Sequence, residues 1–171
     1  HQLHNGWSMD HQGLPPVDVF LAADTDATVA ALLAQLPAGA PRPAAPWPEL
    51  RFEPGPISVP QMAQALRQAI GEQPASLLHV SLSWNAAAWP FRAPLDYIGG
   101  DGGAGIGGGP GIAVGAALAL RGSGRLPVAV CGDGDFLMGV TALWTAVHYQ
   151  IPLLIVVANN RSFFNDELHQ E

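Results

Sequence analysis

The chain has 171 residues, of which 49% are apolar and only 12% are charged, and its net charge is −7. This length suits about one domain, or one domain and part of a second, and the apolar content excludes a disordered chain. The acidic balance argues against a nucleic-acid-binding surface. All seven basic residues are arginines, which excludes a P-loop lysine and a Schiff-base lysine. No apolar run reaches ~18 residues, so we expect no membrane span.

The cysteine content and the two ends of the chain give further expectations. The single cysteine, Cys131, cannot form an internal disulfide, which fits a reducing cytoplasm. The first residues carry no signal-peptide pattern. The chain begins at His1, and near its end Asn165 is predicted to cap a helix with Asp166 and Glu167 in its first turn. We therefore expect a segment of a longer protein.

The first elements in chain order are a strand over 17–23 and a helix over 26–36. We interpret residues 1–38 as the tail of a central α/β domain whose other strands are elsewhere. Residues 39–57 are rich in proline and are predicted to form a semi-rigid linker. A second domain is predicted over 58–171.

This second domain opens with a helix from Ser58 to about Ile70. Ser58 and Gln61 have the spacing of a capping box. The helical pattern places one set of small and apolar residues on a common face: Met62, Ala65, Leu66 and Ala69.

The remaining elements alternate between strands and helices. Strands are predicted over 77–82, 126–131 and 153–158, and helices over 112–120 and 137–149, with an irregular aromatic segment over 83–98 and a glycine-rich segment over 99–111. This alternation predicts an α/β fold in which a parallel sheet has helices on both faces.

Polar residues follow two of these strands. Asp133 comes after the strand 126–131, and Asn159 and Asn160 come after the strand 153–158. In a right-handed βαβ unit the two strands run the same way, so their C-terminal ends meet at the edge where ligands bind. Carboxylate and amide oxygens suit a hard cation such as Mg2+ or Ca2+.

The glycines beside Asp133 predict a phosphate nearby. Gly132 and Gly134 allow a sharp turn and a close approach of a ligand to the backbone. The N-terminus of the following helix offers free N–H groups and a positive dipole end. A cation beside such a helix end indicates a cation-bridged diphosphate. The alternative is an ordinary strand–turn–helix in which Asp133 only caps its helix.

The order of GDG, a helix, a strand and NN resembles the motif of thiamine-diphosphate-dependent enzymes. The chain particularly resembles the acetolactate synthase large-subunit group and its 2-oxo-acid decarboxylase and carboligase relatives. The resemblance covers residues 58–171, as a thiamine diphosphate- and Mg-binding domain truncated at its C-terminus. It implies a thiamine-diphosphate-binding fold, preceded by the tail of that family's central α/β domain.

The resemblance also implies roles for single residues. Asp133 and Asn160 would coordinate Mg2+ through their side chains, and Ser162 through its backbone carbonyl. The N–H groups of Gly134 and Asp135 would face the diphosphate of the cofactor.

The stretch GIGGGPGIAVGAA matches a second part of the family pattern. It implies that Ile106 is the apolar wedge that holds thiamine diphosphate bent. The carbonyl near Ala104, where the family usually has glycine, would accept a hydrogen bond from the 4′-amino group. Gly132 would also belong to the cofactor site.

The implied chemistry belongs to the cofactor, which adds to the carbonyl of a small 2-oxo acid and accepts electrons as carbon dioxide leaves. The product is an aldehyde or, after attack on a second carbonyl, a carboligation product. The activating glutamate of the family comes from a pyrimidine-binding domain of the same or a partner chain, in a homodimer or homotetramer. We therefore expect no catalytic residue in this segment, which alone would be inactive.

Two other functions remain open. The chain could be the diphosphate-binding subunit of a split 2-oxo-acid decarboxylase, or a non-catalytic nucleotide-binding module. The second draws on a G-x-G-x-x-G match at Gly100, Gly102 and Gly105, but no buried strand directly precedes it and no acidic residue lies ~20 positions further on. A calcium loop starting at Asp133 is rejected because its twelfth position is Trp144.

The other reactive residues are predicted to have modest roles. His79 and His148 are interpreted as structural, and Cys131 as a small buried hydrophobe. His169, Phe163 and Phe164 are weaker candidates for a substrate pocket, and core packing is the alternative for the two phenylalanines.

Overall fold

A computed structural model describes residues 18–19, 21–40, 43, 46–47, 49, 54–80, 84–85, 87–99, 105–163 and 167. The chain divides into two compact units, His1–Pro43 and Ala44–Glu171. The division falls inside the proline-rich segment 39–57. Within the described ranges, every helix is too short or too polar to cross a membrane.

The first unit contains helix α1 (Thr25–Gln35), which begins where the sequence predicts a helix. The carboxylate of Asp24 caps it by accepting a hydrogen bond from the N–H of Ala27 at 2.9 Å. None of the residues of α1, all of which the structure describes, is buried. The strand predicted over 17–23 is wrong for 18, 19 and 21–23, which are irregular. A strand needs a neighbour to satisfy its backbone, and no described segment pairs with this one.

The second unit is built on a parallel sheet of three strands in the order β1 (Ala75–His79), β2 (Leu126–Gly132) and β3 (Leu154–Ala158). This arrangement confirms the predicted parallel α/β fold. β1 begins two residues earlier than predicted and ends at His79.

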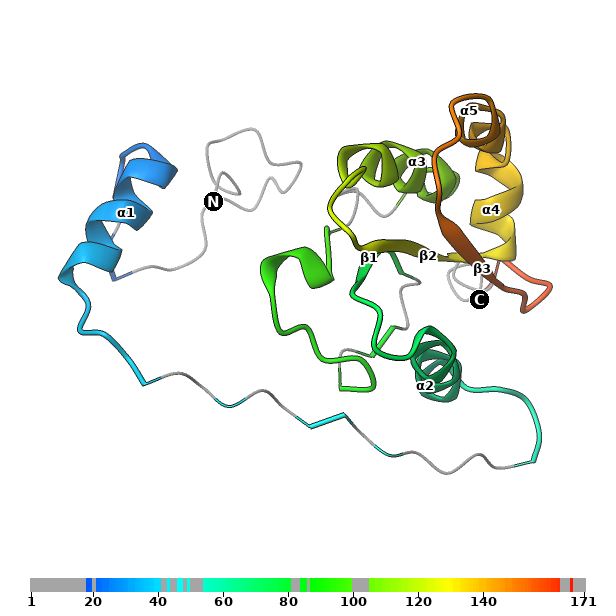
Figure 1. Ribbon diagram of the computed structural model, residues 1–171, viewed down its shortest axis with the longest axis horizontal. Coiled ribbons are helices and arrows are strands. Elements are labelled where there is room, and N and C mark those ends of the chain that lie inside the picture. The colour runs from blue at the N-terminus through cyan, green and yellow to red at the C-terminus, as the bar shows by residue number, and fades with distance from the viewer. Residues whose placement is uncertain are drawn as a thin grey trace. The chain divides into compact units, whose positions relative to one another are not determined.

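Helices cover both faces of this sheet (Figure 1). Helices α3 (Gly109–Ala119), α4 (Asp133–Gly139) and α5 (Ala142–His148) lie on one side, and α2 (Val59–Ile70) lies on the other. A short 3-10 helix, η2 (Pro94–Asp96), lies within the aromatic segment 83–98. Neighbouring strand residues face opposite ways, so Leu78 packs in the core with α3 while Leu77 packs in the core with α2.

The start of α2 confirms the predicted capping box. The N–H of Ser58 donates to Oε1 of Gln61 at 2.9 Å, and Oγ of Ser58 accepts from the N–H of Gln61 at 3.4 Å. Proline occupies the first turn of this helix, where no backbone hydrogen bond is lost.

The buried face of α2 differs from the prediction. Ala63 is fully buried and packs with Leu66 and Ile70, whereas Ala65 and Ala69 of the predicted face are exposed. Ala63 faces the sheet, since it belongs to one buried cluster with Leu77 of β1 and Val128 of β2. Hydrophobicity alone could not distinguish one alanine from another.

The helix predicted over 137–149 is also wrong in its extent. It begins four residues earlier, at Asp133, and is broken between Gly139 and Ala142 into α4 and α5. Glycine and aspartate are poor helix formers, so the segment Gly132–Asp135 resembled a turn. Carboxylates in the first turn of a helix are nevertheless favourable, because they face its positive dipole end.

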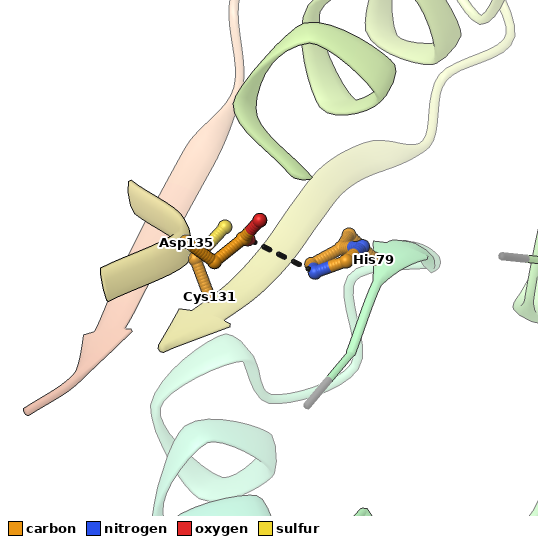
Figure 2. A group of neighbouring side chains, drawn as sticks. All are labelled: His79, Cys131 and Asp135. Atoms are coloured by element: carbon orange, nitrogen blue, oxygen red, sulfur yellow. Dashed lines mark ion pairs between the residues drawn. The ribbon is translucent and has the colours of Figure 1, made fainter. Parts of the chain in front are cut away.

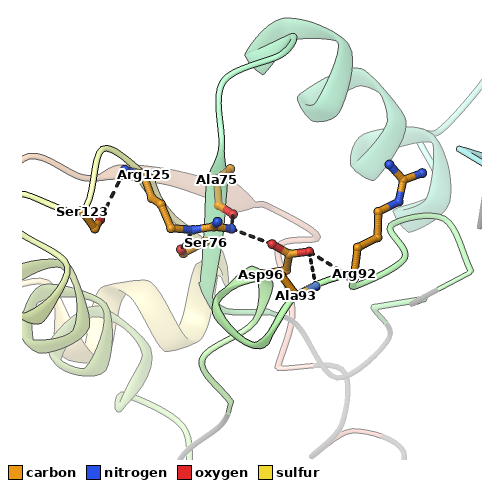
Figure 3. Close-up of polar contacts among 7 residues, drawn as sticks. All are labelled: Ala75, Ser76, Arg92, Ala93, Asp96, Ser123 and Arg125. Carbon is orange, nitrogen blue, oxygen red and sulfur yellow. Dashed lines mark hydrogen bonds and ion pairs between the residues drawn. The ribbon is translucent and has the colours of Figure 1, made fainter. Parts of the chain in front are cut away.

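A polar network closes the N-terminal edge of the sheet (Figure 3). Arg125 donates through Nε to Oγ of Ser76 at 2.7 Å, and through Nη2 to the carbonyl of Ala75 and to Oδ1 of Asp96 at 2.6 Å. These bonds tie η2 to the start of β1. The network lies at the opposite edge from the strand ends that carry the predicted ligands.

The second oxygen of Asp96 is held by the backbone of its own turn. Oδ2 accepts hydrogen bonds from the N–H groups of Arg92 at 2.7 Å and Ala93 at 2.9 Å. Burial alone would raise the pKa of Asp96, but these hydrogen bonds and Arg125 outweigh it, so that the pKa lies below its usual value of 3.8.

Candidate functional site

The candidate site lies where the three parallel strands end. Gly132, the last residue of β2, is directly beside Ala158, the last residue of β3. β1 ends at His79 on the other side of β2. The residues that follow these positions are therefore brought to one edge of the sheet.

Asp133 reaches from the end of β2 to the loop that follows β3. It is the first residue of α4, and its Oδ2 accepts a hydrogen bond from the N–H of Arg161 at 3.1 Å. The same N–H donates to Oδ1 of Asn159 at 3.0 Å. The N-cap residue of α4 is Gly132, and no side chain of the described residues caps this helix. The carboxylate of Asp133 is thus used between strands, not as a cap of its own helix.

The loop after β3 has an unusual backbone at the point of contact. Arg161 has φ of +59°, a left-handed conformation that is uncommon for residues other than glycine and often marks functional sites. Oδ1 of Asn160 accepts from the N–H of Ser162 at 3.0 Å, and the Ser162 hydroxyl donates to Glu167 at 2.6 Å. A helix is predicted to start near Asn165. Of its first residues the structure describes only Glu167, because Asn165 and Asp166 lie outside the described residues.

The donors at this edge suit a hard divalent cation. Asp133 offers a carboxylate oxygen, Asn160 an amide oxygen with a second lone pair beyond its bond to Ser162, and the loop offers backbone carbonyls. A Cβ atom built on Gly132 would meet nothing within 4 Å, so the backbone at the end of β2 is open to a ligand.

Gly134 has a different reason to be glycine. It is buried, and a Cβ atom there would overlap the ring of Phe163. Phe163 therefore lies against the start of α4, close to the predicted diphosphate position, with 45% of its surface exposed.

The glycine-rich loop approaches the same edge. Ile106, the predicted wedge, is 41% exposed, and Gly107 beside it has φ of +95°, which favours glycine. Ala104, the other residue predicted for this loop, lies outside the described residues, as do His169 and Phe164.

A second cluster lies at the same edge and was missed by the sequence analysis: His79, Cys131 and Asp135 (Figure 2). Oδ1 of Asp135 accepts hydrogen bonds from the N–H groups of Gly107 at 2.7 Å and Gly109 at 3.2 Å. Its Oδ2 lies 3.2 Å from Nε2 of His79. This distance allows an ion pair, but Oδ2 is buried and no described residue meets it with hydrogen-bond geometry.

The ligand-type atoms of His79, Cys131 and Asp135 lie within 4.8 Å of one another, as in sites for thiophilic metals. The Cys131 thiol argues against that use. Burial, and then the charge of Asp135 and a hydrogen bond to it, raise the pKa of Cys131 to about 12. A metal would have to displace that proton, because the thiolate is the ligand form.

No pattern along the chain could have revealed this cluster. Its three members come from β1, β2 and α4, and His79 and Asp135 meet only because β1 pairs with β2. The family pattern implies a role in the cofactor site only for the backbone N–H of Asp135.

Other features of the second unit lie outside the site. His148 is exposed and stacks on Trp144 with ring centres 4.6 Å apart; its structural role stays a prediction. A hollow of about 590 Å³ lies among α4, α5 and β3, with apolar walls that include Phe136, Leu143 and Ile155. None of the residues predicted for the site lines it, so we do not regard it as the site of the chemistry.

Comparisons with known proteins agree with the fold and with this edge of the sheet. The family described as "Thiamine pyrophosphate enzyme, C-terminal TPP binding domain" matches residues 81–171, which include β2, β3 and the loops after them. Benzoylformate decarboxylase of Pseudomonas aeruginosa is 32% identical over 158 residues, which cover 86% of this chain and 28% of that protein.

A solved structure has the same fold. The thiamine diphosphate-dependent 4-hydroxybenzoylformate decarboxylase of Rhodococcus jostii RHA1 superposes with a TM-score of 0.64 at 27% sequence identity, over 84% of this chain and 29% of that one. The chain thus spans less than a third of the length of either relative.

Proposed function

Because the chain belongs to the thiamine pyrophosphate enzyme family through its C-terminal TPP binding domain, we propose that it forms the thiamine-diphosphate- and Mg-binding part of an enzyme that decarboxylates a 2-oxo acid. The observation that carries this proposal is the hydrogen bond from the N–H of Arg161 to Asp133. It joins the two strand ends on which the expected ligands lie.

In this proposal the ends of β2 and β3 hold the metal. Asp133 and Asn160 bind Mg2+ through their side-chain oxygens, and Ser162 through its backbone carbonyl. The bent backbone at Arg161 supports the proposal, since it turns the loop back toward Asp133. The N–H groups of Gly134 and Asp135 bind the diphosphate, and the open backbone at Gly132 leaves room for it.

The glycine-rich loop holds the other end of the cofactor. Ile106 supports the bend of the thiamine, and the carbonyl near Ala104 accepts the hydrogen bond of the amino group. The exposure of Ile106 at this edge supports its role. When bound, the cofactor supplies the electron sink that decarboxylation of a 2-oxo acid requires.

The names of the relatives support decarboxylation as the reaction. Both are decarboxylases, of benzoylformate and of 4-hydroxybenzoylformate, which are aromatic 2-oxo acids. We therefore propose an aromatic 2-oxo acid as the first substrate class to test. Carboligation to a second carbonyl, as in acetolactate synthase, is the alternative outcome of the same chemistry.

We further propose that the pyrimidine-binding domain and its activating glutamate are supplied by other parts of the same chain or by a partner, in a homodimer or homotetramer. The comparisons support this indirectly, since the relatives are more than three times as long as the matched part.

The proposed metal site can be tested by changing one carboxylate. Isothermal titration of the chain with thiamine diphosphate, with and without Mg2+, should show Mg2+-dependent binding. We expect Asp133→Asn to weaken that binding at least about tenfold, because it replaces a charged metal ligand by an amide.

Asp26→Asn is the matched control, since it makes the same chemical change at an exposed position of α1. Equal affinities for the wild-type chain and Asp133→Asn would contradict the proposed site. Binding of nucleotides in place of thiamine diphosphate would favour the non-catalytic module instead.

A further inference from the structure

The carboxylate of Asp135 links α4 to the glycine-rich loop. Its side chain is only 14% exposed, and Oδ1 accepts the N–H groups of Gly107 and Gly109 at 2.7 and 3.2 Å. Gly109 is the first residue of α3, whose N-cap residue, Gly108, has no side chain to cap the helix. Asp135 therefore provides from another helix the acceptor and the negative charge that a helix N-terminus favours.

The glycine-rich loop packs so tightly against α4 that there is no room for a side chain at these positions. A Cβ atom on Gly109 would overlap Oδ2 of Asp135, and one on Gly107 would lie 3.0 Å from Cβ of Met138. A Cβ atom on Gly139 would lie 2.5 Å from the carbonyl oxygen of Gly107. Asp135, Met138 and Gly139 are three and four residues apart, so they form one face of α4, and the loop is packed against that face.

The same short helix also carries Asp133, its first residue. Asp133 precedes Asp135 by two residues, so the two side chains lie on different sides of α4. The carboxylate of Asp133 accepts a hydrogen bond from the loop after β3, whereas that of Asp135 accepts hydrogen bonds from the glycine-rich loop. Ile106 is joined directly to Gly107. The position of Ile106 relative to Asp133 is therefore set through the contacts of Asp135.

We propose that Asp135 is a positioning residue that fixes the loop carrying Ile106 and thereby determines how well the chain binds the thiamine end of the cofactor, while the diphosphate end depends on Asp133. This inference rests on the proposed function and deepens it. The neighbours of Asp135 suit the role of a fixed acceptor: two backbone N–H groups donate to Oδ1, and Nε2 of His79 lies 3.2 Å from Oδ2.

The first test needs no cofactor. Hydrogen exchange of the 171-residue chain, followed by NMR, should show protected amides at Gly107 and Gly109. We expect Asp135→Ala to accelerate exchange at both amides about tenfold or more, because both lose a charged acceptor. Asp135→Asn should restore most of the protection, since its Oδ1 can still accept both N–H groups.

The second test separates the two ends of the cofactor. Two ligands are titrated separately in the presence of Mg2+: thiamine diphosphate, and inorganic diphosphate, which lacks the thiamine. The affinities of each variant for the two ligands are then compared. We expect Asp135→Ala to weaken binding of thiamine diphosphate about tenfold and to weaken binding of inorganic diphosphate by a smaller factor, because the backbone N–H of residue 135 is retained in the variant. Ile106→Ala should show the same selective loss, and Asp135→Asn should largely reverse it.

Three results would overturn the proposal. One is unprotected Gly107 and Gly109 amides in the wild-type chain, a measurement that holds even if Asp135→Ala does not fold. Another is an equal loss of affinity for both ligands in Asp135→Ala, which indicates a general structural role. The third is stoichiometric Zn2+ binding that Cys131→Ser abolishes, which would make the cluster a metal site.

Failure of the proposed function has a different result. In that case the wild-type chain binds neither ligand in the presence of Mg2+, while the exchange measurement still reports whether Asp135 fixes the loop.

Discussion

At the scale of single residues, two carboxylates separated by one glycine have different partners. Asp133 contacts the loop after β3, and Asp135 contacts the glycine-rich loop. The role of Asp133 could be proposed from the sequence, because a carboxylate after one strand and asparagines after the next meet whenever the strands are parallel. The side-chain role of Asp135 could not, because the N–H groups that donate to it belong to the backbone of a distant loop.

Cys131 provides a prediction at this scale. Burial, the charge of Asp135 and a hydrogen bond to Asp135 raise its pKa from 9.0 to about 12. We expect the folded chain to be unreactive toward an aromatic disulfide reagent at pH 8, and the unfolded chain to react with one equivalent, since Cys131 is the only cysteine.

The same pKa shift has a consequence for stability. A raised pKa means that the thiol stabilises the fold fully below pH 9 and loses this contribution as pH rises from 9 toward 12. Urea unfolding of the wild-type chain and Cys131→Ala should therefore differ less at pH 11 than at pH 8. Rapid labelling of the native chain at pH 8 would contradict the buried, protonated thiol.

At the scale of elements, the sequence predicted best what depends on local signals. The capping box at Ser58 fixed the start of α2, and apolar runs between turns located β2 and β3. The errors occur where tertiary contacts decide. α4 begins at Asp133 although its first residues are poor helix formers, and α2 is turned so that Ala63 faces the sheet.

The junction of η2 and β1 depends on Arg125 and Asp96, neither of which the sequence singled out. We expect Asp96→Asn to lower the free energy of unfolding by about 2 kcal/mol at pH 7, because a part-buried charge pair loses one partner. The pKa of Asp96 is lowered from 3.8, so its contribution is present above pH 3.8 and is lost as pH falls through the lowered value.

Urea unfolding at pH 7, 5 and 3 measures this dependence, with Glu72→Gln as a control at an exposed position. The difference between the wild-type chain and Asp96→Asn should be similar at pH 7 and 5 and smaller at pH 3. A difference that stays constant down to pH 3 would show that charge does not stabilise this junction.

At the scale of the whole molecule, the described chain holds one part of the proposed active site. It spans 28% of a benzoylformate decarboxylase and 29% of a related structure. The proposed ligands of the metal lie on this part, whereas the glutamate that the family uses to activate the cofactor is proposed to lie on another domain.

We therefore expect the 171-residue chain alone to bind thiamine diphosphate weakly and to release no carbon dioxide from benzoylformate or pyruvate. Titration calorimetry and a coupled assay for carbon dioxide measure the two quantities. Robust turnover by this chain would mean that the activating group is already present in it.

The open side of β3 affects how such measurements should be made. Among the described residues β3 pairs only with β2, and its side chains Leu154 and Val157 are 36% and 39% exposed. A free strand edge with apolar side chains can serve as a template for another copy and lead to aggregation. Self-association at high concentration would then compete with cofactor titrations, so dilution series belong with every affinity measured on this chain.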